Sequence, residues 1–174
     1  MQTTLVILAV CAGASLTYAQ NPLSNEVRAN YAQIKANATK AAAVMPEADY
    51  GFVPGPGSRP YGQTVVHLAE VQMTLCAMAQ GEQPKQIDAT KTRKADAMAA
   101  VAAAFAYCDP IYAALTDQNG LRMAKMFGED RTRFGILNFG VIHDSETYGS
   151  LAVYLRAKNI VPPSTAGSGG GSKK

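Results

Sequence analysis

The sequence has no tryptophan, only two histidines and no run of basic residues. Its formal net charge of +3 includes Lys173 and Lys174 at the extreme C-terminus, so the rest of the chain is near neutral. Proteins that bind nucleic acids electrostatically need a basic surface to neutralise phosphates. The composition therefore argues against a nucleic-acid-binding protein. The chain also lacks a glycine-rich loop followed by Lys and Ser or Thr, which argues against a P-loop nucleotide site.

Charged side chains are also missing from residues 1–19. An apolar stretch from Leu5 to Leu16 is followed by Thr17-Tyr18-Ala19, which fits the small-x-small pattern of a signal-peptidase site. The stretch is too short to span a bilayer comfortably. We therefore predict a signal peptide that is cleaved after Ala19. The mature protein is expected to be periplasmic or secreted, with no membrane attachment.

Three cysteines are present, and one of them, Cys11, lies in the predicted signal peptide. Export would place the other two, Cys76 and Cys108, in an oxidising compartment where disulfides persist. We favour a disulfide between them, which would stabilise the fold by roughly 3–4 kcal/mol. The alternative is that they are two small buried apolar side chains.

Strand-like alternation is absent, and apolar residues instead recur at helical spacing. Ser24 is predicted to cap the first helix, and Pro110 is predicted to kink the third. Together the segments predict an all-α protein, a four-helix bundle. The expected helices are about Asn25–Met45, Tyr61–Ala79, Lys94–Leu115 and Asp130–Lys158.

The remaining segments are expected to be irregular. Residues 46–60 are rich in proline and glycine, and residues 116–129 are rich in turn-forming residues, so both are predicted to be loops. Pro162 and Pro163 end the ordered part. We therefore expect one domain over residues 24–164 and a flexible Gly/Ser/Lys tail over residues 165–174.

The stretch HDSETYGSLAVYLRAKNIVPPS resembles a signature of the DinB/YfiT-like superfamily, H-D-x-E-H-Y-G followed by Y-L-R-x-K-x-I-V-P-P. The stretches AAVMPEADYGFVP, YGQTVVHLAE and AFAYCDPIYAALTD are also similar to this superfamily, and the resemblance covers residues 24–164. It implies a bacterial protein with an up-down-down-up bundle that often forms homodimers. It also implies kinship with metal-dependent hydrolases and thiol transferases that use small thiol cofactors.

Both histidines of the chain fall at metal-ligand positions of that family. His67 lies in the apolar run QTVVHLAEVQMTLCAM, and His143 opens the C-terminal signature. The family's third histidine is expected four residues after His143, on the same helix face, where this chain has Thr147. Three imidazoles with an open position suit zinc, nickel or iron. Because a hydroxyl is a poor ligand for these metals, the resemblance implies a degenerate site that binds a divalent metal weakly.

Carboxylates lie near both histidines in the sequence. Glu70 follows His67 by three residues, and Glu146 follows His143 by three, so either is a possible third ligand or base. Asp144 is expected to support a ligand or to lie on the surface. The alternative for each histidine is an ordinary packed or surface side chain.

Three functional hypotheses remain open at this stage. The first is an exported DinB-like protein with a degenerate, weak metal site and no assigned activity. The second is a non-catalytic module, stress-related or binding an unidentified small molecule. The third is a metal-dependent hydrolase or thiol transferase in which a carboxylate replaces the third histidine. The side chain that reaches the gap at Thr147 discriminates among them, and the sequence does not decide whether the protein is an enzyme.

Overall fold

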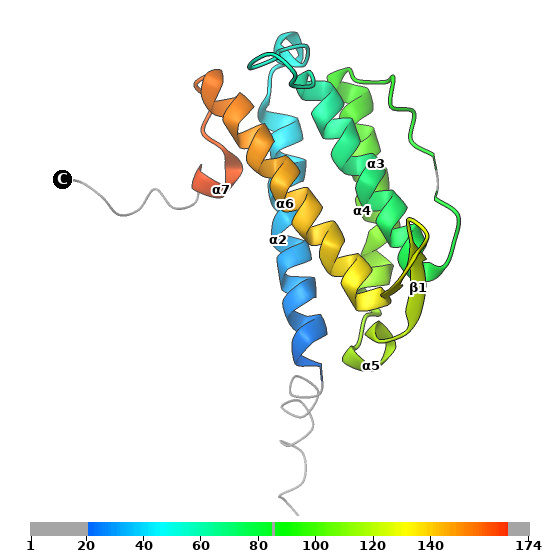
Figure 1. Cartoon of the computed structure of the whole chain (residues 1–174). Helices are drawn as coiled ribbons and strands as arrows, with labels where there is room; N and C mark the ends of the chain where they lie inside the picture. Colours follow the sequence, from blue (N-terminus) through cyan, green and yellow to red (C-terminus); the bar gives the residue numbers. More distant parts are fainter. Residues whose placement is uncertain (1–20, 85, 167–174) are drawn as a thin grey trace, which may run out of the picture.

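The computed structural model of the protein describes residues 21–84 and 86–166. Four long helices lie side by side in it (Figure 1). Helix α3 packs against α4 and α6, and α2 packs against the same two helices. The prediction of an all-α protein is therefore confirmed. The long helices are α2 (Pro22–Val44), α3 (Tyr61–Gln80), α4 (Lys94–Ala113) and α6 (Arg133–Ala157).

These helices match the predicted segments to within a few residues at each end. Pro46 follows the end of α2, and Gly81 ends α3 in the left-handed conformation that glycine adopts most readily. Helix α4 continues through Pro110 and ends within one turn of it, at Ala113. The predicted signal peptide and residues 167–174 of the predicted tail lie outside the described residues. Among the described residues, no helix is long and apolar enough to cross a membrane.

The segment 116–129 differs from its prediction as an irregular loop. It contains the short helix α5 (Asp117–Gly120) and strand β1 (Met123–Met126), which pairs antiparallel with β2 (Glu129–Thr132). The two residues between the strands, Phe127 and Gly128, both have positive φ, at 51° and 92°. A two-residue turn of this kind joins the strands of a hairpin. Helix α6 consequently begins at Arg133, and the prediction that it begins at Asp130 is wrong.

The core contains large aromatic side chains as well as aliphatic ones. Tyr31 of α2 stacks on Tyr112 of α4, with ring centroids 3.7 Å apart, and contacts Phe105 edge-on. The Tyr112 hydroxyl donates a hydrogen bond of 2.8 Å to the Leu137 carbonyl of α6. The phenols therefore link three of the four long helices, and each buried hydroxyl finds an acceptor.

The N-terminus of α2 is held by a residue of α5. Asp117 accepts hydrogen bonds from the Ser24 amide and the Ser24 hydroxyl, both at 2.8 Å, and from the Leu23 amide at 3.3 Å. In return the Asp117 amide donates to the Asn21 side chain. Helix α2 begins at Pro22, so the prediction that Ser24 caps it is wrong. The free amides of the first turn are instead capped by a carboxylate that comes from 93 residues further along the chain.

This contact predicts a loss of stability in acid. Loss of hydration acts to raise the pKa of Asp117, but the hydrogen bonds from Ser24 and Leu23 outweigh it and hold the pKa below its usual value of 3.8. A carboxyl with a lowered folded-state pKa stabilises the protein above its unfolded-state pKa and loses that effect as the pH falls through the folded-state value. We expect Asp117→Asn to lower Tm by a few degrees at neutral pH, and the difference from wild type to shrink as the pH falls below the usual aspartate pKa of 3.8.

Thermal unfolding followed by circular dichroism across this pH range measures the effect. Asp130→Asn is a matched control, because Asp130 is an exposed hairpin residue that forms a surface ion pair with Lys125. An equal Tm for Asp117→Asn and wild type at neutral pH would contradict the assignment of Asp117 as the cap of α2.

Candidate functional site

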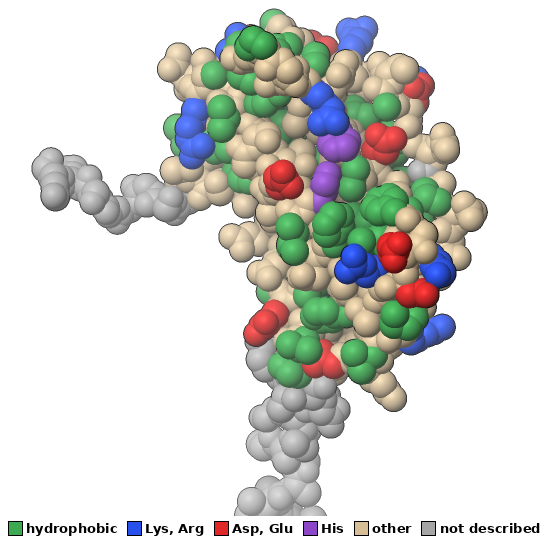
Figure 2. Space-filling view, in the orientation of Figure 1, with side chains coloured by type: hydrophobic (Ala, Val, Ile, Leu, Met, Phe, Trp, Pro, Cys, Tyr) green, Lys and Arg blue, Asp and Glu red, His purple; other side chains and the backbone are tan. Residues whose placement is uncertain are grey.

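The fold brings the two histidines of the chain together. His67 on α3 and His143 on α6 face each other with their Nε2 atoms 3.4 Å apart. Their ring centroids are 5.2 Å apart, and the ring planes are inclined by 69°. Figure 2 shows the two histidines side by side on the surface of the bundle. The two residues that the sequence singled out therefore form one site between α3 and α6.

The position of His67 follows from how α3 is packed. Most of α3 is buried, because β1, α4 and α6 all pack on it. The partly exposed residues recur at helical spacing and form a narrow stripe along one edge. His67 belongs to this stripe, so its ring contacts α6 and yet stays open to solvent. The stripe consists of His67, Glu70, Val71, Thr74 and Met78.

Asp144 supports His143 from inside the bundle. Its side chain is fully buried, and its Oδ1 lies 3.4 Å from His143 Nδ1. Burial raises the pKa of Asp144 to about 6, against the opposing effect of His143. A carboxylate at Nδ1 favours the tautomer with the proton on Nδ1, which leaves a lone pair on Nε2. This is the arrangement that outer-shell carboxylates give to metal-binding histidines. Of the two roles expected for Asp144, the structure rejects the surface one.

The surroundings of His67 favour its neutral form. Burial, the charge of Arg59 and the neighbouring His143 all lower its pKa, while Glu70 acts in the opposite direction. A metal ligand must be a neutral imidazole, so these effects keep a lone pair available near neutral pH. Each ring can therefore direct a nitrogen lone pair toward a metal ion placed between them.

The donor pair fits a metal ion of the expected kind. Zinc binds imidazole nitrogen at roughly 2.0–2.1 Å, and two ligands of a tetrahedral ion are then about 3.4 Å apart. The two Nε2 atoms lie at this separation. Three or more His, Cys, Asp or Glu side chains do not come together as a metal-holding group anywhere in the described part of the chain. The structure thus brings two potential ligands together and, among the described residues, no complete set of three.

The positions considered for a third ligand do not give this pair a third His, Cys, Asp or Glu ligand in the described part of the chain. Thr147 is one turn beyond His143 on α6 and is only 7% exposed. Glu146 is exposed to solvent, and Glu70 is half-buried on the α3 stripe. Among the described residues, neither carboxylate forms a ligand group with both histidines. Of the three carboxylates near the histidines in the sequence, Asp144 is the one that contacts a histidine ring, that of His143.

Gly140, three residues before His143 on α6, is closely packed against the core. A Cβ atom at position 140 would lie 3.0 Å from Gln72 Oε1 and 3.1 Å from the Tyr112 hydroxyl. Gln72 is fully buried, and its Oε1 has no hydrogen-bond partner among the described residues. The glycine therefore admits two polar side chains into the core one turn before the histidine.

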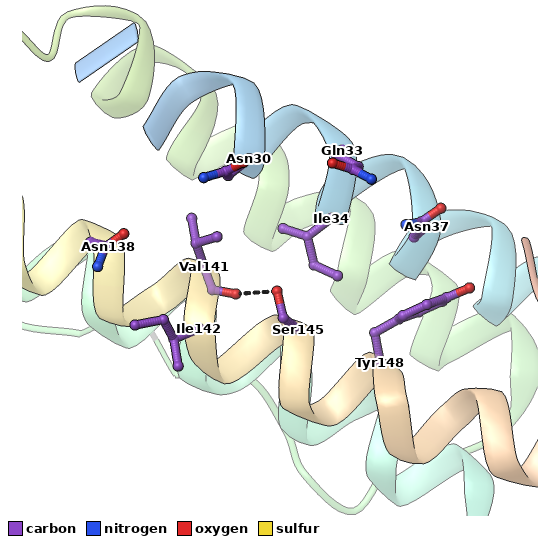
Figure 3. A pocket seen from close by; sticks show the side chains of 9 residues that line it. All are labelled: Asn30, Gln33, Ile34, Asn37, Asn138, Val141, Ile142, Ser145 and Tyr148. Carbon is purple, nitrogen blue, oxygen red and sulfur yellow. Dashed lines mark hydrogen bonds between the residues drawn. The ribbon is translucent and has the colours of Figure 1, made fainter. Parts of the chain in front are cut away.

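Two large grooves lie on the described part of the bundle, besides a smaller one of about 130 Å³ next to Arg133. One, of about 540 Å³, is lined by the loop before α3, by Thr64 of α3 and by the end of α6. Thr64 precedes His67 by one turn on α3, so this groove begins near the histidines, which do not themselves line it. The other, of about 460 Å³, lies between α2 and α6, and none of its lining residues is charged (Figure 3). Carboxamide side chains of both helices line it, and the Ser145 hydroxyl donates a hydrogen bond of 2.7 Å to the Val141 carbonyl. Neither histidine lines this second groove.

These features define a helical bundle with a paired-histidine site between two helices. The model of the DinB superfamily matches residues 30–149, and the chain therefore belongs to this superfamily. The fold is also similar to that of solved DinB-like proteins. One from Bacillus cereus ATCC 10987 is 13% identical, with a TM-score of 0.65 over 76% of this chain and 91% of that one. One from Bacillus subtilis is 16% identical, with a TM-score of 0.63 over 77% and 92%. No curated protein matches the sequence.

Proposed function

We propose that this DinB-superfamily protein binds a divalent metal ion, zinc, nickel or iron, through His67 and His143. The observation that carries the proposal is the pair of Nε2 atoms, which face each other at 3.4 Å from two different helices. A neutral hydrogen bond between the rings accounts for their contact but not for the buried carboxylate behind His143. Burying a carboxylate is costly unless it serves a partner, and a metal-binding histidine is such a partner.

The proposed site is weaker than a three-histidine site. The chain supplies two imidazoles, and the remaining positions would be left to water or to a bound molecule. When bound, the metal would lower the pKa of a coordinated water or thiol. The protein itself orients His143 through Asp144 and favours the neutral form of His67 through burial and Arg59. We leave the third-ligand role of Glu70 and Glu146 as a second candidate, because Glu70 acts electrostatically on His67.

Export and assembly belong to the same proposal. A disulfide joins Cys76 and Cys108, with its sulfur atoms 2.04 Å apart, and disulfides persist mainly outside the cytosol. This supports a periplasmic or secreted protein. The up-down-down-up order of the helices and the formation of homodimers are proposed from the family. Light scattering coupled to size-exclusion chromatography measures the oligomeric state directly.

Metal titration tests the proposal. We expect the wild-type chain, stripped with a chelator and titrated with zinc or nickel in a calorimeter, to bind about one ion per chain. His67→Ala and His143→Ala should each abolish this binding, since one imidazole alone retains no specific ion. Unchanged binding in both alanine variants would refute the site.

Two further variants separate the hypotheses about the third ligand. Glu146→Gln is expected to bind metal as the wild type does, because Glu146 is exposed. Glu70→Gln is the variant that decides whether a carboxylate completes the site. A loss of affinity in Glu70→Gln comparable to that in His67→Ala would favour the hydrolase or transferase hypothesis over the degenerate site.

A further inference from the structure

The groove beside the histidines has a polar lining and one positive charge. The residues that line it come from the loop before α3, from the first turn of α3 and from the C-terminal part of α6. We call it the Arg59 groove. Its lining residues are Pro54, Gly57, Ser58, Arg59, Thr64, Ser150, Val153 and Tyr154.

The Arg59 groove lies near the histidine pair on both helices, although neither histidine lines it. On α3, Thr64 lies one turn before His67. On α6, Ser150 lies one turn beyond Thr147, which is itself one turn beyond His143. Residues three or four apart on a helix are neighbours on its surface. A molecule in the groove could therefore extend from Thr64 along α3 toward His67.

Arg59 is the charged side chain of this groove, and its backbone is fixed. The Tyr154 hydroxyl of α6 donates a hydrogen bond of 2.6 Å to the Arg59 carbonyl. Pro60 follows Arg59 and directly precedes α3, which restricts the backbone further. On the other side, the loop is tied to α6 by the ion pair of 2.8 Å between Asp49 and Lys158. The guanidinium thus projects from a rigid base.

The guanidinium of Arg59 is available to a ligand. The ion pairs among the described residues join other cations to carboxylates and leave Arg59 out. Its positive charge helps to lower the pKa of His67. On the face shown in Figure 2, a basic side chain lies directly beside the histidines. An unpaired guanidinium next to hydroxyls in a concave surface is suited to an anionic group, which it can hold with two parallel hydrogen bonds.

We propose that the Arg59 groove binds a small organic anion, with its carboxylate or phosphate on the Arg59 guanidinium and its other end toward His67 and His143. The Ser58 hydroxyl supplies a further hydrogen bond, whereas the hydroxyls of Thr64 and Ser150 already donate to the carbonyls of Pro60 and Glu146. Val153, 56% exposed, and the Tyr154 ring provide an apolar wall for the carbon skeleton. A groove of about 540 Å³ accommodates a molecule of this size. The inference rests on the proposed function only in identifying the histidines as the reactive end of the groove.

Anion binding to the metal-free protein tests this inference. The full chain, treated with a chelator and labelled with ¹⁵N, is titrated with benzoate and, separately, with inorganic phosphate, and amide shifts are followed by NMR. We expect at least one anion to shift the amides of the groove residues. Arg59→Gln should weaken that binding by about tenfold, the effect of losing a charge-assisted pair of hydrogen bonds. Arg131→Gln, on the exposed strand β2, is the matched control and should bind as wild type.

The outcomes separate this inference from the metal proposal. Shifts with benzoate but not phosphate would assign a carboxylate ligand, and the reverse would assign a phosphate. If His67→Ala loses metal but metal-free Arg59→Gln still binds anions as wild type does, the groove inference fails and the metal proposal stands. If the wild type binds no metal, and Arg59→Gln binds the anion more weakly than the wild type does, the metal proposal fails and the groove inference stands. Absence of shifts with either anion in the wild type would overturn the inference.

Discussion

Thr147→His is expected to convert the weak site into a tight one, raising the affinity for zinc by at least about 10–100-fold. Removing a residue that only hydrogen-bonds to a metal ligand typically lowers metal affinity about 10–100-fold. A new residue that binds the metal directly should change the affinity by at least as much. The expectation follows from helix geometry. Position 147 lies one turn beyond His143 on α6, on the same side of the helix, so an imidazole there projects toward the facing pair.

The substitution has a cost that the measurement must separate from metal binding. Thr147 is only 7% exposed, and an imidazole is larger than the threonine side chain. Overpacking a buried position costs roughly 1–3 kcal/mol, so the metal-free variant should unfold at a lower temperature than wild type. Bound metal should recover that loss, because a ligand that binds only the folded state stabilises it.

Competition with a zinc indicator measures the affinity, and thermal unfolding with and without zinc measures the linked stability. Thr147→Asn is the control, since it enlarges the side chain without adding an imidazole. Equal zinc affinity in folded Thr147→His and in wild type would contradict the idea that position 147 faces the histidine pair.

The sequence was sufficient to locate the histidine site, and the reason is physical. His67 and His143 stand on helices whose apolar residues recur at helical spacing, so their places on the bundle follow from periodicity. Their pairing across helices does not follow from periodicity, and it was expected because the sequence resembles a family. The structure confirms the contact at 3.4 Å.

Other parts of the fold and site depend on contacts that a linear pattern does not contain. The turn of the β-hairpin contains Phe127 with positive φ. Bulky residues rarely adopt this conformation, so residue propensities did not predict the turn. The cap of α2 depends on Asp117, which is distant in sequence. The charge of Arg59 matters because Tyr154 and Pro60 fix its loop beside α3. In each case tertiary contacts override or complete a weak local preference.

Removing the disulfide is expected to destabilise the protein strongly. Cys76 of α3 and Cys108 of α4 are both fully buried, and their Cα atoms are 5.7 Å apart across a sequence separation of 32. Closing a loop of this length is expected to stabilise the fold by about 3–4 kcal/mol, mainly by restricting the unfolded chain. The variant carrying both Cys76→Ala and Cys108→Ala should therefore unfold at a Tm lower by about 10 °C.

The bond should affect stability far more than metal binding. It joins α3 to α4, whereas the histidines lie between α3 and α6, so the site keeps its helix pair when the bond is removed. We expect the double alanine variant to bind zinc as the wild type does at temperatures where both are folded. Reduced wild-type protein separates loss of the covalent bond from loss of the sulfur atoms, and it should unfold near the Tm of the variant. Free thiols at both positions in unreduced exported protein, shown by alkylation and mass spectrometry, would contradict the disulfide and remove its support for export.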